Sequence, residues 1–240
     1  MMNQQNTGFL SGIPPVTKNL IIINALFWVA SLVLPKVGVD LVELLGLHIP
    51  GANHFNPVQF VSYMFMHDTR SVMHLFFNMF AVFMFGRTLE MLWGSKRFLL
   101  FYLMTGVGAG IVQELTWLWS LRDLFFSSTI EMVNLNGEQL ITKKEYFDYF
   151  VTIGASGSVF GVLLAFGMNF PNAPLYIMFI PVPVKAKYVV TGYGLIELFA
   201  GIANFSGDSV AHFAHLGGML FGFFLILYWK KKYPGDGRYF

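Results

Sequence analysis

The chain has 240 residues, of which 55% are hydrophobic and 12% are charged, whereas an average soluble protein has about 45–50% and about 25%. Its 15 Lys and Arg and 13 Asp and Glu are too few to cover a soluble domain of this length, so the composition excludes an ordinary soluble enzyme and predicts a multi-pass integral membrane protein surrounded by lipid. The net charge of +2 gives no indication of nucleic-acid binding, and the absence of cysteine excludes disulfides and thiolate metal sites.

Six apolar stretches are candidate membrane spans, because a helix needs about 20 apolar residues to cross the hydrocarbon. An even number of spans puts both termini on one side, and most Lys and Arg fall on that side, which predicts that it is the cytoplasm. The sequence therefore predicts a cytoplasmic N-terminal segment (1–18), a membrane domain (19–229) and a basic cytoplasmic tail (230–240). The expected spans are Asn19–Pro35, Val72–Trp93, Phe98–Trp119, Gly154–Phe170, Tyr188–Ala203 and Val210–Trp229.

Two long connections are expected on the outer side, at residues 36–71 and 120–150. The first contains Val39–Ile49 and Phe55–Met66, whose mixed apolar and polar composition is typical of helices that lie in the membrane interface. In the second, Asn136–Gly137 separates two short apolar stretches, which predicts a hairpin turn.

Polar side chains inside the apolar spans are the candidate functional residues, because lipid makes them costly and they usually face a cavity or a partner. They are His74, Asn78, Ser156, His212 and His215. Counted from the cytoplasmic ends of their spans, Asn78, Ser156 and His215 lie at one depth, about 22 Å along the helix at about 1.5 Å per residue. A serine, an imidazole and an amide at one depth could serve as a nucleophile, its base and an oxyanion stabiliser.

Small residues predict that the spans carrying these groups pack closely. Gly157-xxx-Gly161 follows Ser156, and Gly218-xxx-Gly222 begins three residues after His215. This spacing lets membrane helices approach until a side chain on one can hydrogen-bond a side chain on the other.

Five motifs occur in order between about His67 and Trp229, and together they closely resemble the rhomboid family of intramembrane serine proteases. This resemblance implies an all-α membrane protein with a six-transmembrane-helix rhomboid-like bundle and both termini cytoplasmic. The motifs are His74-Leu-Phe-Phe-Asn78, Gly86-Arg-Thr-Leu-Glu90, Gly94-Ser95, Gly154-Ala155-Ser156-Gly157 and Ala214-His215-Leu-Gly-Gly218.

The resemblance implies a role for each matching residue. Ser156 corresponds to the family's nucleophile and His215 to its general base, which work as a dyad. His74 and Asn78 correspond to the side chains that form the oxyanion hole with the Ser156 backbone N–H. We expect no carboxylate near His215, because Glu197 belongs to the span Tyr188–Ala203 and Asp208 to a loop. We also expect neither a metal nor another cofactor.

Other residues depart from the family pattern or compete for a role. Phe160 stands where many bacterial members have Tyr stacked on the catalytic imidazole, and stacking does not need the hydroxyl. His212 is the alternative base, but the spacing to Gly218 and the depth favour His215, so we expect His212 to pack at the outer rim. His67 is expected at the cavity entrance beside His74.

Two connections flank the span at Tyr188–Ala203. Before it, the prolines between Pro171 and Pro183 predict a loop against the inner face rather than a helix. After it, Asn204–Val210 is small and polar, the composition of a mobile loop that can cover a cavity. As in the rhomboid family, we expect this loop to be a lid over the site and the span to tilt to admit substrate.

The predicted function is intramembrane serine endopeptidase activity on the transmembrane segments of other membrane proteins, near the outer face. The predicted location is the bacterial inner membrane. A transporter would more often show matching broken helices in two halves. A zinc protease would need a carboxylate ligand that His212-x-x-His215 lacks. A rhomboid-like binding protein without activity is disfavoured by the presence of both Ser156 and His215.

Overall fold

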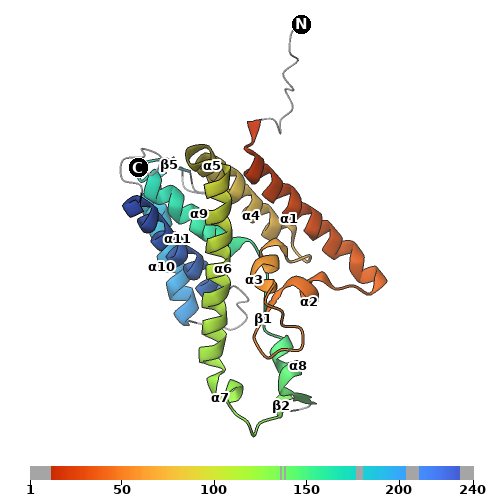
Figure 1. Cartoon of the computed structure of the whole chain (residues 1–240). Coiled ribbons are helices and arrows are strands. Elements are labelled where there is room, and N and C mark those ends of the chain that lie inside the picture. Colours follow the sequence, from red (N-terminus) through yellow and green to blue (C-terminus); the bar gives the residue numbers. More distant parts are fainter. Residues whose placement is uncertain (1–11, 136, 138, 177–180, 204–210, 233–240) are drawn as a thin grey trace.

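The computed structural model describes residues 12–135, 137, 139–176, 181–203 and 211–232. In these ranges the chain forms a bundle of helices accompanied by three short two-stranded β-ribbons, which confirms the predicted all-α membrane fold (Figure 1). The helices of the bundle are α1 (Pro15–Val33), α4 (Val72–Ala81), α5 (Arg87–Trp93), α6 (Ser95–Ser120), α9 (Ser156–Asn169), α10 (Ala186–Ala203) and α11 (His212–Lys232).

Each of the six predicted spans corresponds to a helical segment. The second is continuous through α4, the π-helical turn η4 (Val82–Gly86) and α5. Within the described residues, four segments are long and apolar enough to cross a membrane by themselves: Pro15–Val37, Val72–Trp93, Ser95–Ser120 and His212–Lys232.

The helix α9 is shorter than a membrane is thick. Its 14 residues rise about 21 Å, against a hydrocarbon thickness of about 30 Å. The chain reaches the start of α9 through the extended strand β4 (Val151–Thr152) and the residues that follow it. Ser156, the first residue of α9, therefore lies below the outer surface of the bundle.

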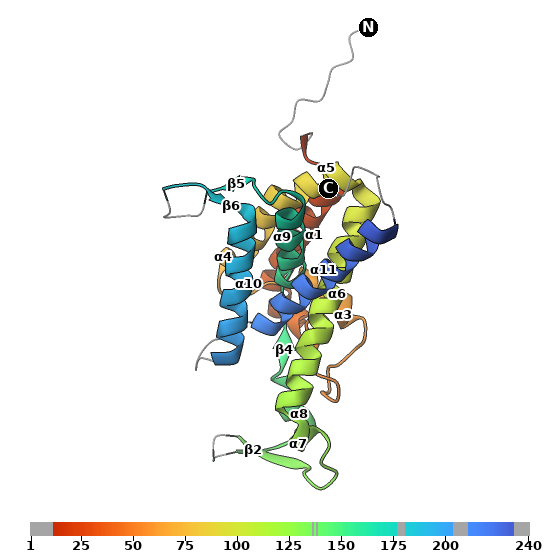
Figure 2. The same ribbon diagram turned by 90° about the vertical axis from the view of Figure 1, so that its left-hand side faces the viewer.

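Close packing places α9 in the middle of the bundle, where it contacts α4, α6, α10 and α11 (Figure 2). A Cβ added at Gly218 of α11 would lie 1.9 Å from the Gly157 carbonyl oxygen, and one added at Gly157 would lie 2.4 Å from the Ala109 Cβ of α6. Because no larger side chain fits at either position, the glycines allow α6, α9 and α11 to approach as the sequence predicts.

The inner end of the bundle is held by a buried carboxylate and by aromatic rings. Glu90 of α5 accepts hydrogen bonds from the Val16 and Thr17 backbone N–H groups at 2.9 and 2.7 Å, so it supplies acceptors for the first turn of α1. Trp93 packs against Phe101 and Trp229, with ring centroids 5.1 and 5.5 Å away. These contacts fix α1, α5, α6 and α11 relative to one another.

The first outer loop forms short helices, as predicted, but it is more tightly folded than a pair of interfacial helices. Its strand β1 (Leu47–His48) pairs antiparallel with β4, shortly before the start of α9. Its other elements are the 3-10 helices η2 (Leu34–Val37) and η3 (Tyr63–Phe65) and the helices α2 (Leu41–Leu45) and α3 (Gln59–Ser62).

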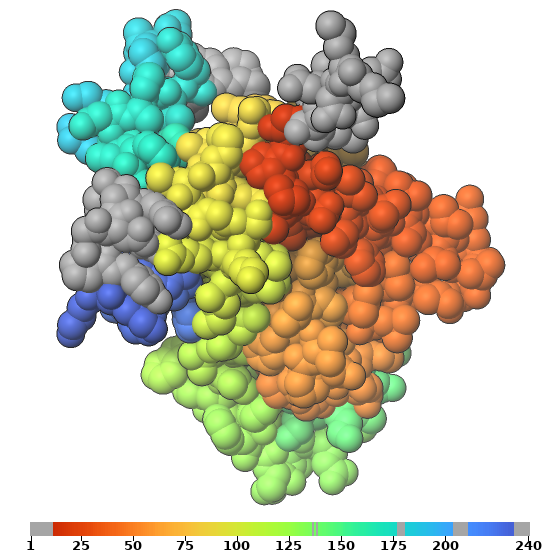
Figure 3. Space-filling view, turned by 45° about the horizontal axis from the view of Figure 1, so that its top comes forward, coloured from red at the N-terminus to blue at the C-terminus, as the bar shows by residue number. Residues whose placement is uncertain are grey.

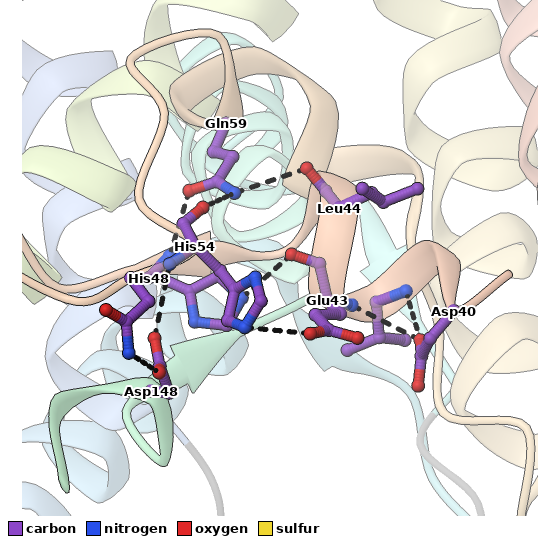
Figure 4. A network of polar contacts seen from close by, with 9 residues as sticks. Asp40, Glu43, Leu44, His48, His54, Gln59 and Asp148 are labelled. Atoms are coloured by element: carbon purple, nitrogen blue, oxygen red, sulfur yellow. Dashed lines mark hydrogen bonds and ion pairs between the residues drawn. The ribbon is translucent and has the colours of Figure 1, made fainter. Parts of the chain in front are cut away.

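His48 is buried, with 3% of its surface exposed. A network of polar contacts around the buried Gln59 holds this part of the loop (Figure 4). The Gln59 amide donates to the His54 carbonyl at 2.7 Å and accepts from the His48 backbone N–H at 3.3 Å. Burial lowers the pKa of His48. The β1–β4 pairing, which sequence alone did not predict, is what takes His48 out of solvent.

The second outer loop confirms the predicted hairpin, since β2 (Met132–Leu135) pairs antiparallel with β3 (Gln139–Thr142). Two short helices flank the hairpin, α7 (Arg122–Phe125) and α8 (Lys143–Asp148). Asp148 accepts hydrogen bonds from the Asn53 side chain at 2.7 Å and the His54 backbone N–H at 3.2 Å. These hydrogen bonds join the two loops, whose surfaces adjoin in Figure 3.

On the inner side, the proline-containing connection is a ribbon of β5 (Pro174–Leu175) and β6 (Val184–Lys185). The predicted lid at Asn204–Val210 falls at residues 204–210, outside the described residues.

Candidate active site

A tight turn places Ser156 at the start of α9. Gly154 has a φ of 125°, a conformation that side chains other than glycine rarely adopt, and its N–H donates to the Tyr63 carbonyl at 2.9 Å. The first hydrogen bond of the helix runs from the Val159 N–H to the Ala155 carbonyl. The Ser156 N–H therefore has no acceptor within the helix and lies at the positive end of its dipole.

Ser156 and His215 lie within hydrogen-bond distance although 59 residues separate them in sequence. The Ser156 Oγ is 2.7 Å from the His215 Nε2. Phe160, one turn after Ser156, stacks on the His215 ring with centroids 4.3 Å apart and planes 8° from parallel. The stacking expected without a tyrosine hydroxyl is thus present, and it fixes the plane of the imidazole.

The expectation that no carboxylate lies near His215 was wrong. Glu197 of α10 has its Oε2 2.9 Å from the His215 Nδ1, on the opposite side of the ring from Ser156. The Glu197 carboxylate and the His215 ring are both largely buried, with 11% and 9% of their side chains exposed. Ser156, His215 and Glu197 therefore form a continuous chain of contacts with the geometry of a Ser-His-carboxylate triad.

His212 shares the same carboxylate. Its Nδ1 lies 2.7 Å from the Glu197 Oε2, so one oxygen atom contacts both histidines of α11. His212 therefore supports the carboxylate that holds His215.

His74 points toward Ser156. The Asp68 backbone N–H donates to the His74 Nδ1 at 3.2 Å, which leaves the proton of the neutral ring on Nε2. A Cβ added at Gly154 would lie 3.0 Å from this Nε2 and 3.7 Å from the Ser156 Oγ. The His74 Nε2–H is therefore a donor directed at the space beside the nucleophile.

His67 lies behind His74 rather than at a cavity entrance. Its ring is fully buried, with its centroid 5.0 Å from that of His74. Neither ring nitrogen has a hydrogen-bond partner among the described residues, and burial together with the neighbouring His74 lowers its pKa to about 4. His67 therefore supports the His74 ring as a neutral packing group.

Asn78 is on the same helix face as His74, but its amide turns back to the backbone. The Asn78 Nδ2 donates to the His74 carbonyl at 2.8 Å, and the side chain is buried outside the cavity that Ser156 lines. The structure thus brings His74, Ser156 and His215 to one space, and Asn78 lies next to it.

The cavity above the serine has a volume of about 670 Å³. The first outer loop, the strand β4 and the start of α11 form its wall. Glu197 and His212 are not among the described residues that line it, so they lie behind His215. The lining residues are Asp40, Val42, Tyr63, Asp68, Thr69, Arg70, His74, Val151, Thr152, Ile153, Gly154, Ser156, Gly157, Ala211, Ala214 and His215.

Glu197 is the residue of the candidate site that the sequence alone did not reveal. A carboxylate inside an apolar span is costly and needs a partner, and α10 runs antiparallel to α11 through a short connection. Residues near the outer ends of two such helices can meet. Those two observations together could have placed Glu197 beside His212 and His215.

Comparisons with known proteins agree with the motifs. The profile of the rhomboid domain matches residues 54–232. The chain is 30% identical over 173 residues to presenilin-associated rhomboid-like protein A, mitochondrial, of Danio rerio, covering 68% of this chain and 37% of that protein. It is 27% identical over 226 residues to rhomboid-like protein 11, chloroplastic, of Arabidopsis thaliana, covering 88% and 67%. The presenilin-associated proteins are thus matched over less than two fifths of their length.

Proposed function

The chain belongs to the rhomboid family, and from that premise we propose that it is an intramembrane serine endopeptidase that cleaves the transmembrane segments of other membrane proteins. The observation that carries this proposal is the 2.7 Å contact between the Ser156 Oγ and the His215 Nε2. A neutral imidazole at this distance can accept the hydroxyl proton as the oxygen attacks a carbonyl carbon.

Glu197 makes the proposed centre a triad rather than the expected dyad. Its carboxylate accepts from the His215 Nδ1–H, so the lone pair of the neutral ring lies on Nε2, toward Ser156. When Nε2 takes up the serine proton, the carboxylate stabilises the resulting imidazolium. Glu197 acts through His215 and is a positioning residue.

The oxyanion would be bound by the Ser156 backbone N–H and the His74 Nε2–H. Both donors exist before the substrate arrives, and the start of α9 adds the positive end of its dipole. Asn78 is a third candidate donor, because its amide carries a second hydrogen besides the one bound to the His74 carbonyl. It would have to rotate toward the cavity to contribute.

The remaining steps follow from the same contacts. The tetrahedral intermediate collapses as His215 donates its proton to the leaving amine, which leaves an acyl-enzyme on Ser156. Water then enters through the cavity, His215 removes a proton from it, and the ester is hydrolysed. The polar lining between Asp68, Thr152 and Gly154 supplies a path for water to a serine that lies below the outer surface.

The proposed substrates must unwind before cleavage, because a helical carbonyl is engaged in its own hydrogen bond. We therefore expect them to carry glycine, proline or polar residues in the outer third of the membrane segment. The proposed setting is a bacterial plasma membrane, and the distribution of Lys and Arg favours an orientation in which the cavity faces outward.

The test compares two serines of α9 in purified full-length protein in lipid bilayers. Ser156→Ala should abolish both cleavage of a transmembrane substrate and labelling by a fluorophosphonate. Ser158→Ala should retain both, because the Ser158 Oγ is buried and donates to the Tyr102 carbonyl at 2.8 Å, away from the cavity. Labelling should persist in the presence of a chelator. Cleavage by the Ser156 variant would end the assignment.

A further inference from the structure

Three metal-ligand atoms converge behind the proposed general base. The Glu197 Oε2, the His212 Nδ1 and the His215 Nδ1 lie within 4.8 Å of one another. The oxygen is 2.7 Å from one nitrogen and 2.9 Å from the other. Two imidazoles and one carboxylate are the ligand set of many zinc sites. The His212-x-x-His215 spacing of α11 alone lacks the carboxylate, which α10 supplies through Glu197.

The geometry suits a small divalent ion. Ligands at about 2.0–2.2 Å from a tetrahedral zinc ion lie about 3.3 Å apart. The Glu197 oxygen would therefore move away from each nitrogen by about half an ångström, and the two nitrogens, which lie within 4.8 Å of each other, would also have to settle at about 3.3 Å. Two nitrogens and one oxygen favour zinc-like ions over Mg²⁺ or Ca²⁺, which prefer oxygen ligands.

The position of the cluster excludes the role of a catalytic metal for the cavity substrate. Glu197 and His212 lie outside the described lining of the cavity, and the His215 ring stands between the cluster and Ser156. An ion bound there would reach the reaction only through His215.

We propose that Glu197, His212 and His215 bind a zinc-like divalent cation and that this binding inhibits the enzyme; the inhibition, though not the binding, rests on the proposed function. A neutral imidazole has one protonated nitrogen. If the metal takes the lone pair of the His215 Nδ1, the ring proton moves to Nε2. The Nε2 then donates toward the Ser156 Oγ and has no lone pair to accept its proton, so the serine is not activated.

The binding arm uses purified full-length protein in detergent, with Zn²⁺ as the probe and the bound metal measured after removal of free ions. The wild type should bind one Zn²⁺ that His212→Ala binds at least about tenfold more weakly. His54→Ala, which removes an imidazole beside Glu43 in the outer loop, should bind it as the wild type does. His212→Gln provides a second variant if alanine impairs folding. Equal affinity in the wild type and both His212 variants would overturn the site.

The activity arm measures cleavage with and without Zn²⁺, each protein being compared with its own metal-free rate. Zn²⁺ should inhibit the wild type and His54→Ala by more than about tenfold, with recovery after chelation, and should affect His212→Ala little. Equal inhibition of the His212 variant would refute control through this cluster. If no protein cleaves or labels under any condition, the proposed function fails, whereas the binding arm still decides whether the metal site exists.

Discussion

Removal of the Glu197 carboxylate is the sharpest test of the site geometry, because the resemblance to dyad proteases does not require it. Glu197→Ala should lower kcat while leaving KM nearly unchanged, since the carboxylate contacts His215 and not the cavity. Glu197→Gln keeps an acceptor of similar size but removes the charge, so its kcat should fall between those of the wild type and the alanine variant.

The magnitude follows from the contact that is lost. A hydrogen bond to a charged group contributes about 1.5–3 kcal/mol, and here it is largely withdrawn from water, with 11% of the Glu197 side chain exposed. The imidazolium that forms in the transition state would lose this contact. At about 1.36 kcal/mol per factor of ten, kcat should fall about 10- to 150-fold.

The assay combines steady-state cleavage of a transmembrane substrate with the rate of fluorophosphonate labelling, which reports the reactivity of Ser156 without substrate entry. His212→Ala is the matched control, because it removes the other contact of the same carboxylate oxygen. It should retain most activity, whereas His215→Ala should be inactive. If folded Glu197→Ala labelled and cleaved within about twofold of the wild type, the triad would be refuted and the dyad would remain.

Three further perturbations test separate parts of the structure. His74→Ala should lower kcat by up to the roughly 10²–10³-fold that one oxyanion donor contributes. Asn78→Ala should lower kcat by less, because the Asn78 amide is bonded to the His74 carbonyl. An unchanged kcat for Asn78→Ala would remove Asn78 from the site. Gly218→Ala puts a Cβ against the Gly157 carbonyl oxygen, whereas Gly192→Ala meets nothing within 4 Å. Only Gly218→Ala should therefore lower the melting temperature, by about 6–12 °C for a destabilisation of about 3 kcal/mol. Equal melting temperatures of the two variants would contradict the close approach of α9 and α11. Burial lowers the pKa of His67 from 6.5 to about 4, so the folded protein protonates His67 less readily than the unfolded chain does. The free energy of unfolding should therefore fall by roughly 3 kcal/mol as the pH drops from 6.5 to about 4. Thermal unfolding of His67→Phe should lose this part of the acid sensitivity, and an identical pH profile would show that His67 is not its source.

The sequence by itself determined the features that depend on local composition. The lengths of the apolar stretches located the helical segments. In lipid, the backbone N–H and C=O groups must hydrogen-bond to each other, and a helix satisfies them within one segment. The hairpin of β2 and β3 follows from the local preference of Asn-Gly for a turn between two strands. Ser156, His215 and the glycines beside them were identified by motif and by equal depth, which helix rise alone determines.

Only the tertiary structure decided what lies beside each helix. Hydropathy predicts the depth of a residue in the membrane but not its lateral neighbours. The partners of Glu197 are set by the packing of α10 against α11, which brings its carboxylate to His212 and His215. The orientation of the Asn78 amide, toward the His74 carbonyl, is likewise a competition between nearby hydrogen-bond partners. His48 is buried because β1 pairs with β4 across about a hundred residues of sequence. The environments of Glu197 and His48 depend on contacts between separate segments, which no local pattern specifies.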